Sequence, residues 1–272
     1  MRQLIGGAAA IAGVSLALLV STPTRRSKLL WLYNKGGFYF LLRATCGSRP
    51  RKNFLDTRGP DTWERLDRDE DAKGKEHAVM LTGSSILRRW LTAEQCLAPL
   101  PVLNRAFGGS RTWELDDVVA DKIAAYAPAV LVHYCGSNDF VWAYHANVSF
   151  RKVAAEAAAN TRRFAERLQR HLPGLQVLFV GAIRSPKKHT QGCAHAIDCL
   201  NMAVARMCSE RPEHWHYADM NPRLECETTG EPRGDLYLDD GVHYKQESYE
   251  HFAVVLVPLV QQLYRSRDDA KS

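Results

Sequence analysis

Four short apolar runs, rich in β-branched residues and bounded by glycine or proline, are separated by longer segments with apolar residues at helical spacing. The runs cover 78–83, 102–107, 129–136 and 175–182, with a weaker fifth at 214–219. Runs that are apolar throughout are typical of strands buried on both faces of a parallel sheet. The pattern therefore predicts a three-layer α/β domain, with a parallel sheet between two layers of helices.

Helical spacing is clearest in four segments that lie between or after these runs. They cover 86–95, 112–126, 150–172 and 247–265, the last of which contains Pro258. Because strand-like and helix-like segments alternate, helices would form the crossovers that parallel strands require.

The chain has 272 residues, 46% of them hydrophobic, which is enough for the core of one large domain. We place this domain at 78–266, with a short C-terminal tail at 267–272. The segment before it, 29–77, begins apolar and becomes dense in charge, so we interpret it as a connecting segment. The formal net charge of +6 is spread along the chain and does not favour a nucleic-acid partner.

The N-terminal segment is more informative. Leu4–Thr24 is a run of 21 residues without a charge, followed by the basic sequence RRSK. The run is long enough to span a bilayer, although its glycines, serines and threonines make the span marginal. A cleavable signal or organelle-targeting segment is the alternative, with Arg2 as its positive start but no A-x-A-like cleavage site. We therefore predict that 1–28 is a membrane anchor or signal segment, which places the protein on a membrane or in the secretory pathway.

Seven cysteines include no CxxC pair, so their spacing does not favour a zinc site. Cys193 and Cys199 could form a disulfide in a lumenal domain, but we favour isolated thiols. No metal and no organic cofactor are expected.

Polar residues and glycines follow three of the predicted strands and precede the last helix. In an open parallel sheet the ligand site lies beyond the carboxyl ends of the strands, so these residues are the candidates for function. Each alone is typical of a helix cap, a turn or a surface position. They are Gly83, Ser84 and Ser85; Asn104, Gly108 and Gly109; Gly136, Asn138 and Asp139; and Asp240 with His243.

Taken together, these residues supply the parts that acyl transfer needs: a nucleophilic hydroxyl, an imidazole base, a carboxylate and donors for an oxyanion. The four blocks TGSSI, NRAFGG, GSND and DGVH resemble, in the same order, those of the SGNH hydrolases, also called GDSL-type esterases and lipases. The resemblance extends from about Val79 to Leu263. It implies a flavodoxin-like fold and hydrolysis of a small-molecule or lipid ester through an acyl-serine intermediate.

The resemblance also implies a role for each residue of a catalytic triad. Ser85 would be the nucleophile, His243 the general base and Asp240 the carboxylate that orients the base. Ser84 stands where many members of the family have aspartate. Asp239 is the competitor for the role of Asp240, but the D-x-x-H spacing favours Asp240.

Three donors for the oxyanion are implied in the same way. They are the backbone N–H of Ser85, the backbone N–H of Gly109 and the side-chain amide of Asn138. Gly108 replaces Gly109 if the alignment shifts by one residue.

The substrate itself stays open, and so do two alternatives to a hydrolase. We favour a packing role for Trp142. Trp142 and Tyr144 follow GSND directly, however, and this loop could line the acyl or alcohol pocket. A catalytically inactive binding module would keep the fold without turnover. An O-acyltransferase would use the same triad but pass the acyl group to a hydroxyl acceptor.

Overall fold

The computed structural model describes residues 73, 75–115 and 117–269. The predicted anchor or signal segment at 1–28 and nearly all of the connecting segment at 29–77 lie outside these residues, so both stay predictions. Among the residues described, no helix is both long enough and apolar enough to cross a membrane. The described parts of 73–144 and 148–269 belong to one compact unit.

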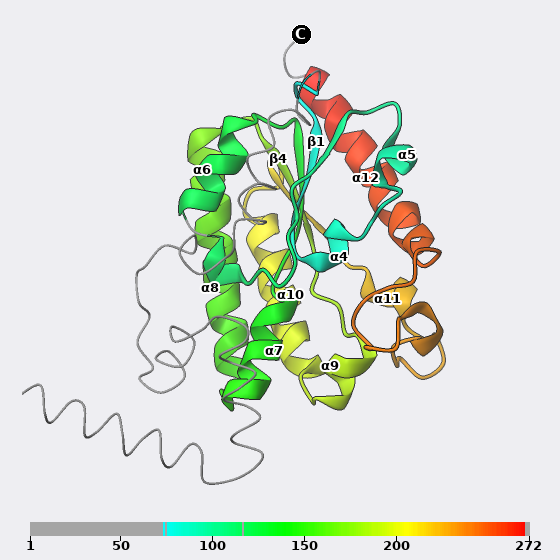
Figure 1. Ribbon diagram of the computed structural model, residues 1–272. Helices are drawn as coiled ribbons and strands as arrows, with labels where there is room; N and C mark the ends of the chain where they lie inside the picture. The colour runs from blue at the N-terminus through cyan, green and yellow to red at the C-terminus, as the bar shows by residue number, and fades with distance from the viewer. Residues whose placement is uncertain (1–72, 74, 116, 270–272) are drawn as a thin grey trace, which may run out of the picture. The chain divides into compact units, whose positions relative to one another are not determined.

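A five-stranded, all-parallel sheet forms the middle of this unit, as the apolar runs predict (Figure 1). The strand order is β2-β1-β3-β4-β5, which is a flavodoxin-like arrangement. The strands are β1 (Val79–Gly83), β2 (Val102–Asn104), β3 (Val130–Tyr134), β4 (Gln176–Val180) and β5 (Trp215–Ala218).

Helices cover both faces of the sheet and connect its strands. They are α4 (Ser85–Arg88), α5 (Ala93–Leu97), α6 (Asp117–Ala125), α7 (Ser137–Ala146), α8 (Phe150–His171), α9 (Pro186–Thr190), α10 (Ala194–Ser209), α11 (Asn221–Leu224) and α12 (Tyr249–Asp269), with the 3-10 turns η3 (Thr112–Glu114) and η4 (Gly234–Leu236). In Figure 1, α6, α8 and α10 lie on one side of the sheet and α5 and α12 on the other. The three-layer prediction is therefore confirmed.

Side chains of β3 alternate between the two faces of the sheet and pack against both layers of helices. Val132 and Tyr134 point into the apolar core that Phe252 of α12 also enters. His133 points to the opposite face, where its ring lies 4.8 Å from that of Phe164 on α8. Successive residues of a strand face opposite sides of the sheet, so one short strand contributes to both layers.

Two predicted helices are wrong in extent. The segment 86–95 forms two short helices, α4 and α5, because the chain turns inward between them to bury Trp90, whose ring stacks on Tyr249 at 6.4 Å. The segment 112–126 begins as the 3-10 turn η3, and α6 starts only at Asp117. Burial of a large aromatic side chain outweighs helix propensity in the first case.

Two further helices, α7 and α10, are absent from the sequence-based prediction. The first contains Trp142 and Tyr144, so the segment after GSND is a helix and not the expected loop. In α10 the buried residues Ile197, Leu200 and Val204 recur at helical spacing, a signal that was present in the sequence.

Helix α12 continues through Pro258 as a single element. Proline removes the N–H that would bond to the carbonyl of Val254, four residues earlier. Val254 is 57% exposed, so solvent can reach this part of the helix. The opposite side carries Tyr249, Phe252 and Leu256 into the core, and their burial stabilises the helix.

The sheet order opens a site between the carboxyl ends of β1 and β3, because the chain leaves β1 toward β2 on one side and β3 lies on the other. Backbone hydrogen bonds hold this edge together. The N–H of Ser84 donates to the carbonyl of Tyr134 at 2.9 Å, and the N–H of Phe107 donates to that of Gly83 at 2.9 Å. The segments that follow β1 and β2 therefore start from defined positions.

Gly83→Ala is expected to lower the free energy of unfolding by more than about 4 kcal/mol or to prevent folding. Gly83 has φ +106, and a Cβ atom there would lie 1.9 Å from the carbonyl oxygen of Tyr134. Urea unfolding followed by circular dichroism measures the effect. Gly174→Ala is the control, because an added Cβ there meets no atom within 4 Å. Equal stability of the two variants would contradict the argument.

Candidate active site

Ser85 is the first residue of α4, immediately after the turn that ends β1. Ser84 is the N-cap of the same helix, and its buried hydroxyl accepts a long hydrogen bond of 3.5 Å from the N–H of Ile86. The two hydroxyls that the sequence places side by side are thus separated by the fold. Ser84 points to the helix end, whereas Ser85 faces the residues at the C-terminal part of the chain.

His243 meets Ser85 across 158 residues of sequence. Its Nε2 lies 2.9 Å from Ser85 Oγ, and its Nδ1 lies 2.5 Å from Asp240 Oδ2. A carboxylate on Nδ1 favours the tautomer with the proton there, which leaves Nε2 as an acceptor for the serine hydroxyl. The structure therefore brings together the three residues that the sequence placed in one triad.

Asp240 also shapes the turn that carries the histidine. Its Oδ1 accepts hydrogen bonds from the N–H groups of Val242, at 2.9 Å, and His243, at 2.8 Å. Partial burial acts to raise the pKa of Asp240, but hydrogen bonds from His243 and Val242 outweigh it and leave the pKa below its ordinary value. Asp240, not the neighbouring Asp239, is the carboxylate bound to the imidazole.

The turn is anchored to two other parts of the fold. The N–H of Lys187, at the start of α9, donates to the carbonyl of Gly241 at 3.1 Å. Beyond the turn, the hydroxyl of Tyr249 on α12 donates to the carbonyl of Ile86 on α4 at 2.7 Å. The histidine and the serine are therefore held from both sides, although the His243 side chain is 23% exposed and open to solvent.

Gly109 and Asn138 come from the segments after β2 and β3, and Ser110 joins them. The side-chain amide of Asn138 donates to the carbonyl of Ser110 at 3.0 Å, which brings it to the residue next to Gly109. Gly109 has φ +75, a conformation that glycine adopts without strain. The second and third blocks of the sequence thus meet at the same edge of the sheet.

Asp139 reinforces this junction from inside the protein. Its carboxylate is buried and accepts from the N–H of Thr112 at 3.0 Å and from the hydroxyl of Thr112 at 2.7 Å. Burial raises the pKa of Asp139 to about 6, and the hydrogen bonds from Thr112 oppose this rise. Asp139 was a candidate because it follows a predicted strand, whereas nothing in the sequence around Thr112 indicates that it binds Asp139.

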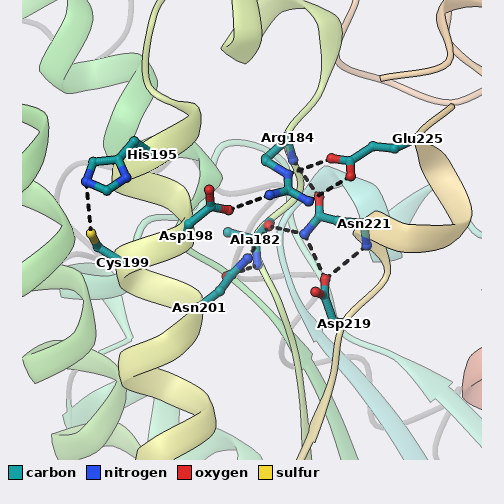
Figure 2. A network of polar contacts seen from close by, with 9 residues as sticks. All are labelled: Ala182, Arg184, His195, Asp198, Cys199, Asn201, Asp219, Asn221 and Glu225. Atoms are coloured by element: carbon teal, nitrogen blue, oxygen red, sulfur yellow. Dashed lines mark hydrogen bonds and ion pairs between the residues drawn. The ribbon is translucent and has the colours of Figure 1, made fainter. Parts of the chain in front are cut away.

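A polar network beyond the ends of β4 and β5 was not predicted (Figure 2). Arg184 follows β4, and its guanidinium binds both carboxylate oxygens of Glu225, at 2.6 and 2.7 Å, and Asp198 at 2.8 Å. Asn221 accepts from the backbone N–H of Arg184 at 2.9 Å. Asn201 of α10 both donates to and accepts from the backbone of Ala182, each at 2.8 Å.

The network positions the segment that leads into α9. Residues 182–184 are held on both sides, and Lys187 follows three residues later with its hydrogen bond to Gly241. The Arg184 network therefore supports the turn of Asp240 and His243 without touching either side chain. No local sequence pattern signals this, because the partners of Arg184 come from α10 and from the segment after β5.

Cys193 and Cys199 were candidates for a disulfide. Cys193 and Cys199 are free thiols, so the favoured interpretation holds over the disulfide. Cys46 lies outside the described residues. Across 73, 75–115 and 117–269, no three His, Cys, Asp or Glu side chains gather in a way that could hold a metal ion.

Comparisons with known proteins identify the family of this chain. The sequence pattern of a family described as GDSL-like lipase/acylhydrolase matches residues 79–251, which include Ser85, Asn138, Asp240 and His243. No curated protein sequence matches the chain significantly.

Solved structures share the fold at low sequence identity. A GDSL-like lipase from Bacteroides thetaiotaomicron superposes with a TM-score of 0.55 at 16% identity, over 73% of this chain and 99% of its own. A carbohydrate esterase family 3 protein from Talaromyces cellulolyticus superposes with a TM-score of 0.53 at 15% identity, over 70% and 98% of the two chains.

Arg184→Lys is expected to lower the free energy of unfolding by about 2 kcal/mol, because lysine lacks the fork that binds both oxygens of Glu225. The value is discounted because the Arg184 side chain is 28% exposed. Arg162→Lys is the matched control: Arg162 makes the same fork with Glu210, at 2.7 and 2.7 Å, but on the open surface of α8. Urea unfolding should show no measurable loss in the control, and equal losses would argue against the proposed support.

Proposed function

Because this chain belongs to the GDSL-like lipase/acylhydrolase family and is therefore an esterase, we propose that it cleaves carboxylic esters through a covalent acyl intermediate on Ser85. The observation that carries the proposal is the contact of 2.9 Å between Ser85 Oγ and His243 Nε2, with Asp240 on the other ring nitrogen. This order of hydroxyl, imidazole and carboxylate is the arrangement that activates a serine for attack on a carbonyl.

The first half of the reaction forms the acyl-enzyme. Ser85 Oγ attacks the ester carbonyl while His243 Nε2 accepts the hydroxyl proton. The oxyanion is stabilised by the N–H of Ser85, the N–H of Gly109 and the side-chain amide of Asn138. Collapse of the tetrahedral species breaks the ester C–O bond, and His243 gives its proton to the departing alcohol.

The second half regenerates the enzyme. Water attacks the acyl-serine while His243 accepts one of its protons, and the same donors stabilise the second oxyanion. His243 then returns the proton to Ser85 Oγ as the acid is released. Asp240 stays ionised and holds the imidazole in orientation throughout. The partial exposure of the His243 side chain supports the attack of water on the acyl-serine, since solvent water can reach the imidazole.

Ser85→Ala and His243→Ala should each remove nearly all turnover, on the order of 10⁶-fold, whereas Asp240→Ala should cost less, roughly 10⁴-fold. Hydrolysis of p-nitrophenyl acetate measures the effect, and a fluorophosphonate probe should label Ser85. Ser84→Ala is the control: it removes only a weak helix cap, worth about 1 kcal/mol of stability, and most activity should survive.

The reverse result, with Ser84→Ala inactive and Ser85→Ala active, would contradict the assignment. Folded protein that neither reacts with the probe nor hydrolyses esters would indicate an inactive binding module. Acyl transfer to an added alcohol in preference to water would indicate an acyltransferase.

Activity should be lost at acidic pH, because a protonated imidazole cannot accept the proton of Ser85. Asp240 adds no step of its own at neutral pH, since its pKa lies below the ordinary value. Burial raises the pKa of Asp139 to about 6, so this carboxyl titrates within the range measured. Burial lowers the pKa of His133 to about 3, so the imidazole of His133 is neutral above that pH and does not affect the profile. The measurement is kcat/KM from about pH 4 to 9, and undiminished activity at the acidic end would require a different base.

A further inference from the structure

Arg88 lies one helical turn after Ser85, on the same side of α4. Long side chains on a helix lean back toward its N-terminal end, which here is the end that carries Ser85. The contact with the next segment agrees with this direction. A Cβ atom on Gly108 would lie 3.7 Å from one terminal nitrogen of the Arg88 guanidinium and 3.8 Å from its central carbon. The guanidinium therefore stands beside the glycine turn that contains Gly108 and Gly109.

This guanidinium has no carboxylate partner among the described residues, and it is exposed to solvent. Other arginines of the domain are paired: Arg184 with Glu225, Arg162 with Glu210 and Arg167 with Asp121. An arginine without a partner next to a reaction centre keeps its full charge and its planar set of donors for a ligand.

Arg88 also lines a cavity of about 550 Å³, whose lining includes residues of α5 and β2. The charged side chains on the wall of this cavity are Lys73, Lys75, Arg88, Arg105 and Glu94. Among the described residues of this wall, Glu94 is the carboxylate, and it already binds Lys75 at 3.0 Å. The cavity is large enough for a small ligand, and its charge favours an anion.

The remaining cations differ from Arg88 in their freedom to bind. Lys75 also donates to the carbonyl of Val102 at 2.9 Å, so its ammonium is engaged twice. Arg105 is buried, and its guanidinium lies over the ring of Tyr126 at 5.0 Å. These two contribute charge to the cavity, whereas the exposed guanidinium of Arg88 is placed to donate hydrogen bonds.

We propose that Arg88 and the cavity beside it form a subsite for an anionic oxygen group, so that the substrates of this esterase are esters that also carry a carboxylate or a phosphate. The proposal rests on the acyl-Ser85 mechanism. Arginine binds both kinds of group through two parallel N–H donors. The anionic group stays outside the reaction, and Arg88 raises the occupancy of the productive complex for substrates that carry it.

Two pairs of matched esters test the proposal. The first pair is the mono-p-nitrophenyl ester of glutaric acid and its methyl ester, which differ by a carboxylate on the acyl side. The second pair is 4-acetoxyphenyl phosphate and 4-acetoxyphenyl methyl ether, which differ by a phosphate on the alcohol side. Taking the ratio of wild type to variant for each ester cancels the intrinsic reactivity of the compounds.

Arg88→Gln should lower kcat/KM about tenfold, or 1.4 kcal/mol, for the anionic ester of at least one pair, mainly through KM. The neutral esters should change by less than about twofold, because they make no charged contact with this subsite. Arg88→Lys should keep part of the preference. Added salt at about 0.5 M should reduce the preference in the wild type, since an exposed charge is screened. The pair that responds identifies whether the acid is on the acyl or the alcohol side.

Arg89→Gln is the matched control. It removes the same charge one position later, from a side chain close enough to Tyr249 of α12 to influence its pKa. Equal losses in Arg88→Gln and Arg89→Gln would show a general effect of charge and overturn the proposal. An unchanged preference in Arg88→Gln on both pairs would overturn it as well. If Arg88→Gln leaves the preference unchanged but Ser85 is still required for hydrolysis of the neutral esters, the subsite is wrong and the proposed function stands. If the wild type hydrolyses none of the four esters, the result counts against the proposed function.

Discussion

The close approach of Gly83 to Tyr134 is the constraint on which the rest of the site depends. The two residues pair across β1 and β3, and the carbonyl of Tyr134 accepts the N–H of Ser84. Any side chain at position 83 would enter the space of that carbonyl. The chain can leave β1 here only with a positive φ, and this turn starts α4 with Ser85 as its first residue. The position of one hydroxyl therefore follows from a backbone contact between two strands.

The other parts of the site reach Ser85 through bonds between side chains and backbone. Asn104 donates to the carbonyl of Leu87 and so binds the second segment to α4. Asn138 donates to the carbonyl of Ser110 and binds the third segment to the second. Each bond is single, directional and partly buried, so it sets a position more than it adds stability. Ser85 and Asn138 lie at the starts of α4 and α7, and His243 lies in the turn before α12. The parallel sheet supplies the common edge where these segments meet.

Charge is distributed unequally around this edge. The buried carboxylate of Asp139 is held by Thr112, and Asp240 is held by the turn of His243. Both acids are engaged within the protein. Arg88 has no such partner among the described residues, and its guanidinium lies beside Gly108. This difference is the basis for the subsite proposed at Arg88.

The sequence by itself determined the fold class, and its four blocks, through their resemblance to a known family, indicated which serine, aspartate and histidine would meet. Apolar runs between helical segments favour a covered parallel sheet, and the D-x-x-H spacing lets one turn return a carboxylate to its histidine. The extents of the helices were less predictable, since burial of Trp90 ends α4 after one turn. Only the tertiary structure decided that Arg184 binds Glu225 and Asp198 while Arg88 binds no carboxylate among the described residues. These outcomes depend on strand order and side-chain direction across distant segments, and the charge of an arginine does not reveal its neighbours.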